Sequence, residues 1–430
     1  MSKIVIDHLA RVEGHGGITV ELEGDTVSNV QFDVFEGARL LEPLVRGKRY
    51  DEVAPVLSRI CSICSVAHTL TSLKATENAF AVRVSPQTEL LRELMFRGES
   101  IESHALHLFL LAVPDYLNYP SAIALSADKP AIVLLGLRLK KLGNLIQETI
   151  GGRAIHPVNA VPGGFGKAPA VEQLIELRSA LMQGVADSDA AMDVMAALPA
   201  ADFCHCDTVY AALRSPSVDS YYAGDEVMAV SDGSRAIVHA ADYKTLTNER
   251  AAAHSHAKHS TFREKPFMVG SLARLTVNPR RLTGKLAVAK KRLKLQLPAD
   301  NPMDNNKAQA LELISDVERA LEIIEQLLRA GVKDEPPVPV HPRASTGTAI
   351  TEAPRGLLIH SYSYDGDGCI TAADVITPTA LNAASLEMHF RKAVEQSVER
   401  DDAALSRKLQ MIARAYDPCI SCSVHLLRRQ

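Results

Sequence analysis

Two short segments at opposite ends of the chain decide how it is read: RICSICSVAH (residues 59–68) and DPCISCSVH (residues 417–425). Each carries a Cys-x-x-Cys pair, a spacing that lets both thiolates face one point. A single pair is typical of a redox site, a zinc site or chance, whereas two pairs favour a metal centre. Zinc ribbons place their pairs roughly 15–20 residues apart, because a small local knuckle has to close.

These pairs are separated by almost the whole chain, so a shared site would join both ends of one folded unit. Four soft thiolates in one site favour a transition metal such as nickel or iron. Unrelated reduced thiols and two separate redox pairs remain the alternatives. The other three cysteines, Cys204, Cys206 and Cys369, show no ligand spacing of this kind.

The composition is that of an ordinary globular protein. The chain has 430 residues, a net charge of −4 and 47% hydrophobic residues. This near-neutral balance argues against a nucleic-acid surface or a polybasic membrane anchor. The start, MSKIVIDHLA, shows no signal peptide, and no apolar run approaches the ~20 residues of a membrane span. We therefore expect a cytoplasmic protein with no membrane span and no nucleic-acid partner.

Hydrophobic patterning predicts an α+β fold that is predominantly α-helical. Residues 17–37 alternate around a Gly24-Asp25 turn, which is typical of a β-hairpin or meander. Helical spacing dominates from about residue 65, and residues 314–328 form the clearest amphipathic stripe. Residues 355–376 predict a second hairpin around DGDG, where turn chemistry is favoured over a calcium loop.

We expect one domain over residues 1–430, since no repeat or change of composition marks a boundary. Its expected parts are a β-rich N-terminal part (1–60), a helical body (61–333), a proline-rich connector (334–348), a C-terminal part that closes the metal site (349–425) and a short extension (426–430).

The two cysteine motifs resemble the paired signatures of the large, catalytic subunit of [NiFe]-hydrogenases. Other segments resemble that family in the same order along the chain: RVEGHGGI (11–18), EGARLLEPLVRGK (36–48), ESHALHLFLLAVPDY (102–116), GGRAIHPVNAVPGGFGK (151–167), HSHAKHSTFREKPFMVGSLAR (254–274), TEAPRG (351–356) and VITPTALN (375–382). Several look most similar to the cytoplasmic NAD(P)-linked branch, the sulfhydrogenase α-subunits. The resemblance implies the large-subunit fold, with a long-helix core.

The resemblance implies that Cys61 and Cys419 are terminal nickel ligands, and that Cys64 and Cys422 bridge nickel to an iron carrying carbon monoxide and cyanide. It also implies that Glu13 passes protons from the nickel site towards solvent. An N-terminal salt bridge to Arg11 is the alternative for Glu13.

Further roles implied by the resemblance surround that centre. Arg355 lies above the metals, with Pro354, Asp115 and Asp417 beside it, and the two aspartates are expected to hold the guanidinium. Thr377 and Thr379 donate hydrogen bonds to the cyanides. An ion pair for Arg355, a helix cap for Asp417 and turn structure for the threonines are the alternatives.

A second metal site, for Mg²⁺ or Fe²⁺, is implied at Glu42, the carbonyl of Val375 and His425. The tail LLRRQ (426–430) follows the histidine at which mature family members end, so the resemblance implies that a maturation endopeptidase removes it after nickel insertion. His68, His104, His107 and His156 fit hydrogen bonds around the centre or core packing equally well. HSHAKHS (254–260) favours packing or a subunit contact.

The resemblance implies reversible cleavage of H2 by a heteromultimeric enzyme. Three cysteines remain beside the predicted tetrad, whereas a [4Fe–4S] cluster normally takes four, and no G-x-G-x-x-G fingerprint is present. Electrons would leave through an iron–sulfur small subunit and then through flavin/NAD(P)-binding and Fe–S electron-transfer subunits. Sulfur or polysulfide reduction would accompany the sulfhydrogenase branch, and nickel-insertion proteins would load the metal.

The alternatives are a deazaflavin- or heterodisulfide-reductase-linked hydrogenase, a complex I-like subunit without hydrogenase activity and a plain zinc protein.

Overall fold

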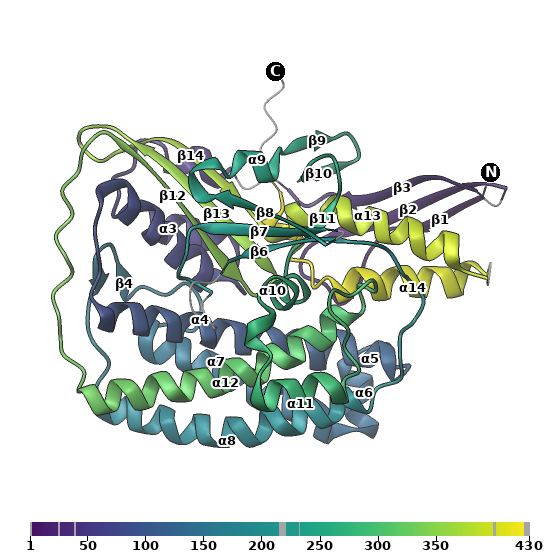
Figure 1. Cartoon of the computed structure of the whole chain (residues 1–430), viewed down its shortest axis with the longest axis horizontal. Coiled ribbons are helices and arrows are strands. Elements are labelled where there is room, and N and C mark those ends of the chain that lie inside the picture. The colour runs from purple at the N-terminus through teal and green to yellow at the C-terminus, as the bar shows by residue number, and fades with distance from the viewer. Residues whose placement is uncertain are drawn as a thin grey trace.

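Helices build most of the computed structural model, and the strands form small separate sheets (Figure 1). The structure describes residues 2–24, 26–37, 40–214, 221–231, 233–398 and 401–424. This arrangement confirms the predicted helix-rich α+β fold.

The helices run along the whole described chain. They are α1 (Leu41–Val45), α2 (Val53–Leu57), η1 (Ser58–Ile60), α3 (Ser65–Phe80), α4 (Pro86–Leu106), η2 (His107–Ala112), α5 (Val113–Tyr116), α6 (Ala122–Asp128), α7 (Pro130–Gly151), α8 (Val171–Ala196), η3 (Ala240–Asp242), α9 (Lys244–Thr247), α10 (Ser271–Val277), η4 (Pro279–Arg281), α11 (Gly284–Arg292), α12 (Asp304–Ala330), α13 (Pro378–Gln396), α14 (Asp402–Ala415) and η5 (Ile420–Cys422).

The long helices α4, α7, α8 and α12 pack together as a bundle below the sheets (Figure 1). The amphipathic stripe predicted at residues 314–328 lies in α12, with Ile314, Val317 and Ile324 buried. Helices α4 and α7 approach closely, because a Cβ on Gly143 would lie 2.4 Å from the carbonyl oxygen of Gly98. These four helices form the part of the molecule that lies below the sheets (Figure 1).

The strands are β1 (Ser2–Ile6), β2 (Gly16–Glu23), β3 (Thr26–Val34), β4 (Ala160–Val161), β5 (Gly164–Phe165), β6 (Val209–Leu213), β7 (Glu226–Ser231), β8 (Ser234–His239), β9 (Arg250–Ala252), β10 (Ser255–His259), β11 (Phe267–Met268), β12 (Ser345–Ala353), β13 (Gly356–Tyr364) and β14 (Ile370–Ile376). Both predicted hairpins form, as β2–β3 and β13–β14, and each gains a third antiparallel strand, β1 and β12 respectively. The DGDG segment is a turn, in which the Asp365 carboxylate accepts the Asp367 and Cys369 N–H groups.

Two details differ from the sequence-based expectation. The sheet β11-β6-β7-β8 lies inside the segment expected to be a helical body. The extended connector gives way to β12 at Ser345, inside the expected proline-rich range. Short strands such as β6, buried at every position, show no alternation that would distinguish them from helix.

Among the described residues, no helix is both long and apolar enough to span a bilayer.

Candidate metal centre

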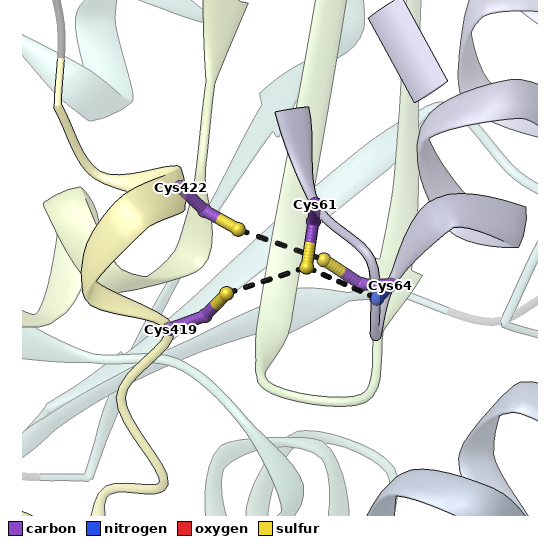
Figure 2. Close-up of side chains that lie close together, drawn as sticks. All are labelled: Cys61, Cys64, Cys419 and Cys422. Carbon is purple, nitrogen blue, oxygen red and sulfur yellow. Dashed lines mark hydrogen bonds between the residues drawn. The ribbon is translucent and has the colours of Figure 1, made fainter. Parts of the chain in front are cut away.

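The two cysteine pairs meet in the interior (Figure 2). Cys61 and Cys64 lie in the loop between η1 and α3, whereas Cys419 and Cys422 follow α14. The four sulfur atoms lie within 4.8 Å of one another, and all four side chains are buried. The Sγ atoms of Cys61 and Cys419 are 3.3 Å apart, and those of Cys64 and Cys422 are 3.8 Å apart. This convergence excludes unrelated thiols and two separate pairs.

The first pair is held by contacts within the helical core. The Cys64 N–H donates to Cys61 Sγ over 3.1 Å. Helix α3 begins at the next residue, and its first amides donate to the buried Glu99 carboxylate of α4: Val66 N over 2.7 Å and Ala67 N over 3.0 Å. A carboxylate at a helix N-terminus satisfies free amides and complements the helix dipole. Glu99 therefore fixes the helix that starts directly behind the pair.

The second pair is held by residues from distant segments. The Cys419 N–H donates to the hydroxyl oxygen of Thr379 at the start of α13, over 2.9 Å. Glu13 and Cys419 form an isolated parallel bridge, and the Ile420 N–H donates to the Glu13 carbonyl over 2.9 Å. Gly14 permits this approach, since it has φ of 85° and a Cβ there would lie 2.7 Å from Ser421 N.

The Glu13 carboxylate lies directly against the second pair. Cys419 Sγ is 3.1 Å from Glu13 Oε2, and the Ser421 N–H and hydroxyl also donate to this carboxylate. Glu13 is half-buried, between the enclosed thiols and the outside. Arg11, offered as an alternative partner, pairs with Asp115 instead.

The four thiols do not ionise alike. Burial would raise the pKa of Cys61, but hydrogen bonds from the other three thiols and the Arg355 charge bring it well below its usual value. Contact with Cys419 lowers the pKa of Cys64, yet the contacts with Cys422 and Cys61 and burial outweigh this and raise it. The neighbouring thiols raise the pKa of Cys419, and burial raises that of Cys422 to about 11. Four neighbouring thiols can all be ionised only if a cation balances their charge. A metal ion does this, and its binding releases the thiol protons.

Arg355 lies at the tip of the β12–β13 hairpin. Ala353 pairs with Gly356, so Pro354 and Arg355 form a two-residue turn. The Arg355 guanidinium donates to the Asp417 carbonyl over 2.7 Å and to Asp417 Oδ1 over 2.9 Å. Burial would lower the Arg355 pKa, but Asp417 and the cysteines raise it well above its usual value, so the group stays charged. Its Nη1 atom is buried without a hydrogen-bond partner among the described residues.

The expected contact between Asp115 and Arg355 is wrong. Asp115 instead pairs with Arg11 and with Arg414, whose Nε is 2.5 Å from Asp115 Oδ2. Both carboxylate oxygens are thereby used, and Asp417 alone of the two aspartates holds Arg355.

The two threonines have different environments. Thr379 accepts the Cys419 N–H, which leaves its own hydroxyl proton available. Thr377 is buried, and its hydroxyl has no hydrogen-bond partner in the described part of the chain. A buried hydroxyl is normally paired, so Thr377 and the Nη1 atom of Arg355 are two unused donors, as a bound polar group would require.

Comparison with known proteins assigns the family. The profile described as Nickel-dependent hydrogenase matches residues 39–141 and 207–425, and the one described as HoxL-like matches residues 3–36. The chain belongs to the nickel-dependent hydrogenase family. It resembles sulfhydrogenase 1 subunit alpha of Pyrococcus furiosus at 37% identity, covering 99% of this chain and 98% of the relative. Sulfhydrogenase 2 subunit alpha of the same organism is 34% identical, with 99% of each chain covered.

A solved structure supports the same family assignment. A chain of an NAD+-reducing [NiFe]-hydrogenase in the H2-reduced state matches with a TM-score of 0.88 and 28% identity, over 99% of this chain and all of that one. The protein is therefore a hydrogenase large subunit with the large-subunit fold, and an oxidoreductase that acts on H2.

In this hydrogenase chain, the expected Mg²⁺ or Fe²⁺ site is only partly described. The carboxylate of Glu42 accepts the Val375 N–H over 2.8 Å, so these two predicted residues are neighbours. His425 and the tail 426–430 lie outside the described residues.

A buried charged network behind the Arg355 hairpin was not predicted. Arg274 donates to Glu312 over 2.6 Å, to Glu352 over 3.1 Å and to the Pro354 carbonyl over 2.8 Å. Burial would raise the pKa of Glu312, but Arg274 brings it well below its usual value, whereas burial raises the pKa of Glu352 to about 7. One feature of the sequence could have indicated this network. Arg274 lies within an otherwise apolar segment, and a buried charged residue rarely lacks a partner.

The four histidines of the matching motifs all make hydrogen bonds. His107 bonds to Gln309, which donates to Asp417, so this imidazole is connected to the centre through one side chain. The other three bond as follows: His68 to His360, His104 to Glu312, and His156 to Ser65 and Ser58. The cysteines at 204, 206 and 369 are free and are not part of the four-sulfur cluster.

Proposed function

We propose that this hydrogenase subunit splits H2 heterolytically at a nickel–iron centre held by Cys61, Cys64, Cys419 and Cys422. The observation that carries the proposal is the set of four buried sulfur atoms within 4.8 Å, with Cys419 Sγ 3.1 Å from the Glu13 carboxylate. Soft thiolates in this number suit nickel and iron. Arg355 and Thr377 each have a donor without a partner among the described residues, which supports diatomic ligands beside them.

The centre, with carbon monoxide and cyanide on iron, would supply the chemistry that converts H2 to two protons and two electrons. The chain's residues would position and carry the protons. The Cys419 thiolate takes the first proton, and Glu13 passes it outward. This order is favoured because Glu13 touches both the buried thiol and less buried surroundings. Arg355, the other acceptor considered, keeps its own proton and its charge, so it orients the reacting groups instead.

The other residues set the shape and charge of the space above the sulfur atoms. Asp417 holds the Arg355 guanidinium with two hydrogen bonds, a geometry that fixes both its position and its charge. Pro354 forms the hairpin turn together with Arg355. Asp115 forms ion pairs with Arg11 and Arg414. Thr377 and Thr379 would donate to the cyanides. Glu42, Val375 and His425 would hold Mg²⁺ or Fe²⁺.

Electrons would leave through a separate iron–sulfur small subunit. Seven cysteines less the four of the cluster leave three, below the four that a [4Fe–4S] cluster normally needs. The similarity to sulfhydrogenase alpha subunits and to an NAD+-reducing enzyme supports onward transfer to flavin and NAD(P) subunits, with sulfur or polysulfide as a second acceptor. A cytoplasmic location, nickel-insertion proteins and a maturation endopeptidase that leaves His425 as the last residue belong to the same proposal, as does a single domain.

The test is to purify the complex from cells that carry the maturation proteins, then measure its metals and its H2 uptake. Nickel and iron in the large subunit, with NAD(P)-dependent uptake, support the proposal. Uptake with a deazaflavin acceptor alone would place the chain in another hydrogenase branch. Zinc as the only metal in a fully matured, active complex would contradict the nickel centre.

A further inference from the structure

A second group of metal-ligating side chains lies away from the cysteines. His254 precedes β10 and His259 is its last residue, whereas Glu387 lies in α13, which packs against β10 and β3. One nitrogen of each imidazole and one carboxylate oxygen lie within 4.8 Å of one another. His254 Nε2 is 2.7 Å from Glu387 Oε1, and His259 Nε2 is 3.2 Å from the same oxygen.

His259 provides an independent sign of a missing ligand. Its side chain is 5% exposed, yet neither ring nitrogen has a hydrogen-bond partner in the described structure. The 3.2 Å contact with Glu387 therefore has a distance suited to a hydrogen bond but not the geometry of one. Beyond this contact, no described group offsets the cost of desolvating the imidazole.

The Glu387 carboxylate is already held in place by the backbone. The Phe32 N–H donates to Glu387 Oε1 over 2.9 Å and orients the carboxylate. Such hydrogen bonds to ligating groups are typical of metal sites.

We propose that His254, His259 and Glu387 bind one divalent transition-metal ion of the Zn²⁺ type. Two imidazoles and one carboxylate are a zinc ligand set, and ligand atoms at zinc bond lengths lie roughly 3.3 Å apart. The 3.2 Å between His259 Nε2 and Glu387 Oε1 fits this spacing, whereas the 2.7 Å hydrogen bond between His254 and Glu387 would open slightly around the ion. Mg²⁺ and Ca²⁺ prefer oxygen ligands, which argues against them here. His254 and Glu387 are 23% and 19% exposed, so an ion and a completing water can reach the site.

The ion has a structural consequence near the cysteines. Ala257 of β10 forms an antiparallel bridge with Val424, two residues beyond Cys422. A metal that joins β10 to α13 fixes the strand with which Val424 of the C-terminal segment pairs. The site is thus a clamp on the scaffold and takes no part in the reaction itself.

The experiment measures zinc in the matured complex by mass spectrometry and its ligands by zinc-edge X-ray absorption. We expect about one zinc per large subunit with nitrogen and oxygen ligands near 2.0–2.2 Å, and no sulfur shell near 2.3 Å. His259→Gln loses this zinc. His256→Gln keeps it, because His256 lies on the exposed side of the same strand and bonds to the Glu36 carbonyl.

Several results would overturn the site. Absence of zinc from complex supplied with Zn²⁺ means that the three side chains only pack together. Zinc bound through sulfur places the ion at the cysteines instead. If His259→Gln fails to fold, the absorption spectrum of the unaltered complex and the variant His254→Gln, at a partly exposed position, still decide the question. Retention of zinc by His254→Gln contradicts the proposal.

Discussion

The two cysteine pairs are built in opposite ways. Cys61 and Cys64 lie between helical segments that are continuous in sequence, and the helix behind them is held by one buried carboxylate, Glu99. Cys419 and Cys422 lie on a short segment whose contacts come from the first residues of the chain, from α13 and from β10. The first pair therefore depends on local structure, and the second depends on the completed fold.

This difference gives the pairs separate roles in assembly. A pair set by neighbouring helices can form as soon as those helices pack. A pair set by Glu13 and Thr379 needs segments from both ends of the chain, and such non-local contacts are costly to close. We infer that the second pair completes the site, whereas the first pair offers a prepared half of it.

The largest expected effect comes from removing a sulfur ligand of either pair. Cys64→Ser and Cys422→Ser should each lose nickel and reduce H2 uptake to background, because a hydroxyl replaces a soft thiolate. Metal analysis and an H2-uptake assay check this. Cys206→Ser, which alters a thiol outside the cluster, is the control. Full activity in Cys64→Ser would mean that the cluster is not the reactive centre.

The next effect separates proton transfer from metal binding. Glu13→Gln should lower H2 oxidation by about 10²–10⁴-fold, the range for loss of a proton-transfer group, and nickel should stay bound. H2 uptake and H/D exchange measure the change. Ser421→Ala is the matched control, since it removes a hydrogen bond to Glu13 but leaves the carboxylate. An unchanged rate in Glu13→Gln would move the proton path elsewhere.

A third change tests the support of the Arg355 hairpin. Arg274→Met leaves Glu312 and Glu352 buried without their cation, which should destabilise the fold by about 3–5 kcal/mol. Denaturant unfolding of the full chain measures it. Arg292→Met removes an exposed pair with Asp193 and should cost no more than about 1 kcal/mol. Equal effects of the two changes would show that the buried network contributes no special support.

The smallest effect should occur at the first cysteine pair. Burial raises the pKa of Glu99 well above its usual value, so Glu99→Gln removes little charge and keeps a carbonyl acceptor for the Val66 and Ala67 amides. We therefore expect a loss of no more than about 1 kcal/mol, with nickel retained. Thermal unfolding and nickel content provide the check. Loss of nickel in this variant would contradict the view that the first pair is set robustly by its helices.

Local pattern was enough to predict much of the fold. Alternation gave the β2–β3 hairpin, an Asp-Gly turn gave β13–β14, and the 3.6-residue period gave α12. The sheet containing β6 escaped prediction because its strand is buried at every position and so does not alternate. The break between α13 and α14 lies in a polar segment that contains neither glycine nor proline to mark it.

For the site, the sequence indicated the cysteine ligands more reliably than the contacts between the surrounding side chains. The spacing of the cysteine pairs favoured a shared metal centre, and the four sulfur atoms do converge in the structure. The partners of Asp115 could not be predicted from the sequence. Arg11, Arg355 and Arg414 lie far apart along the chain, and only the packing of the folded chain decides which of them reach this carboxylate. The same limit hid Glu387, which joins HSHAKHS from a distant helix.

Nickel-edge X-ray absorption of the matured complex tests the central claim most directly. If one site is built from both ends of the chain, the protein ligands of nickel are sulfur atoms only, and Cys61→Ser and Cys419→Ser each remove part of that sulfur shell or the nickel itself. A nickel shell dominated by nitrogen and oxygen, or a sulfur shell that is unchanged in Cys419→Ser, would contradict the account.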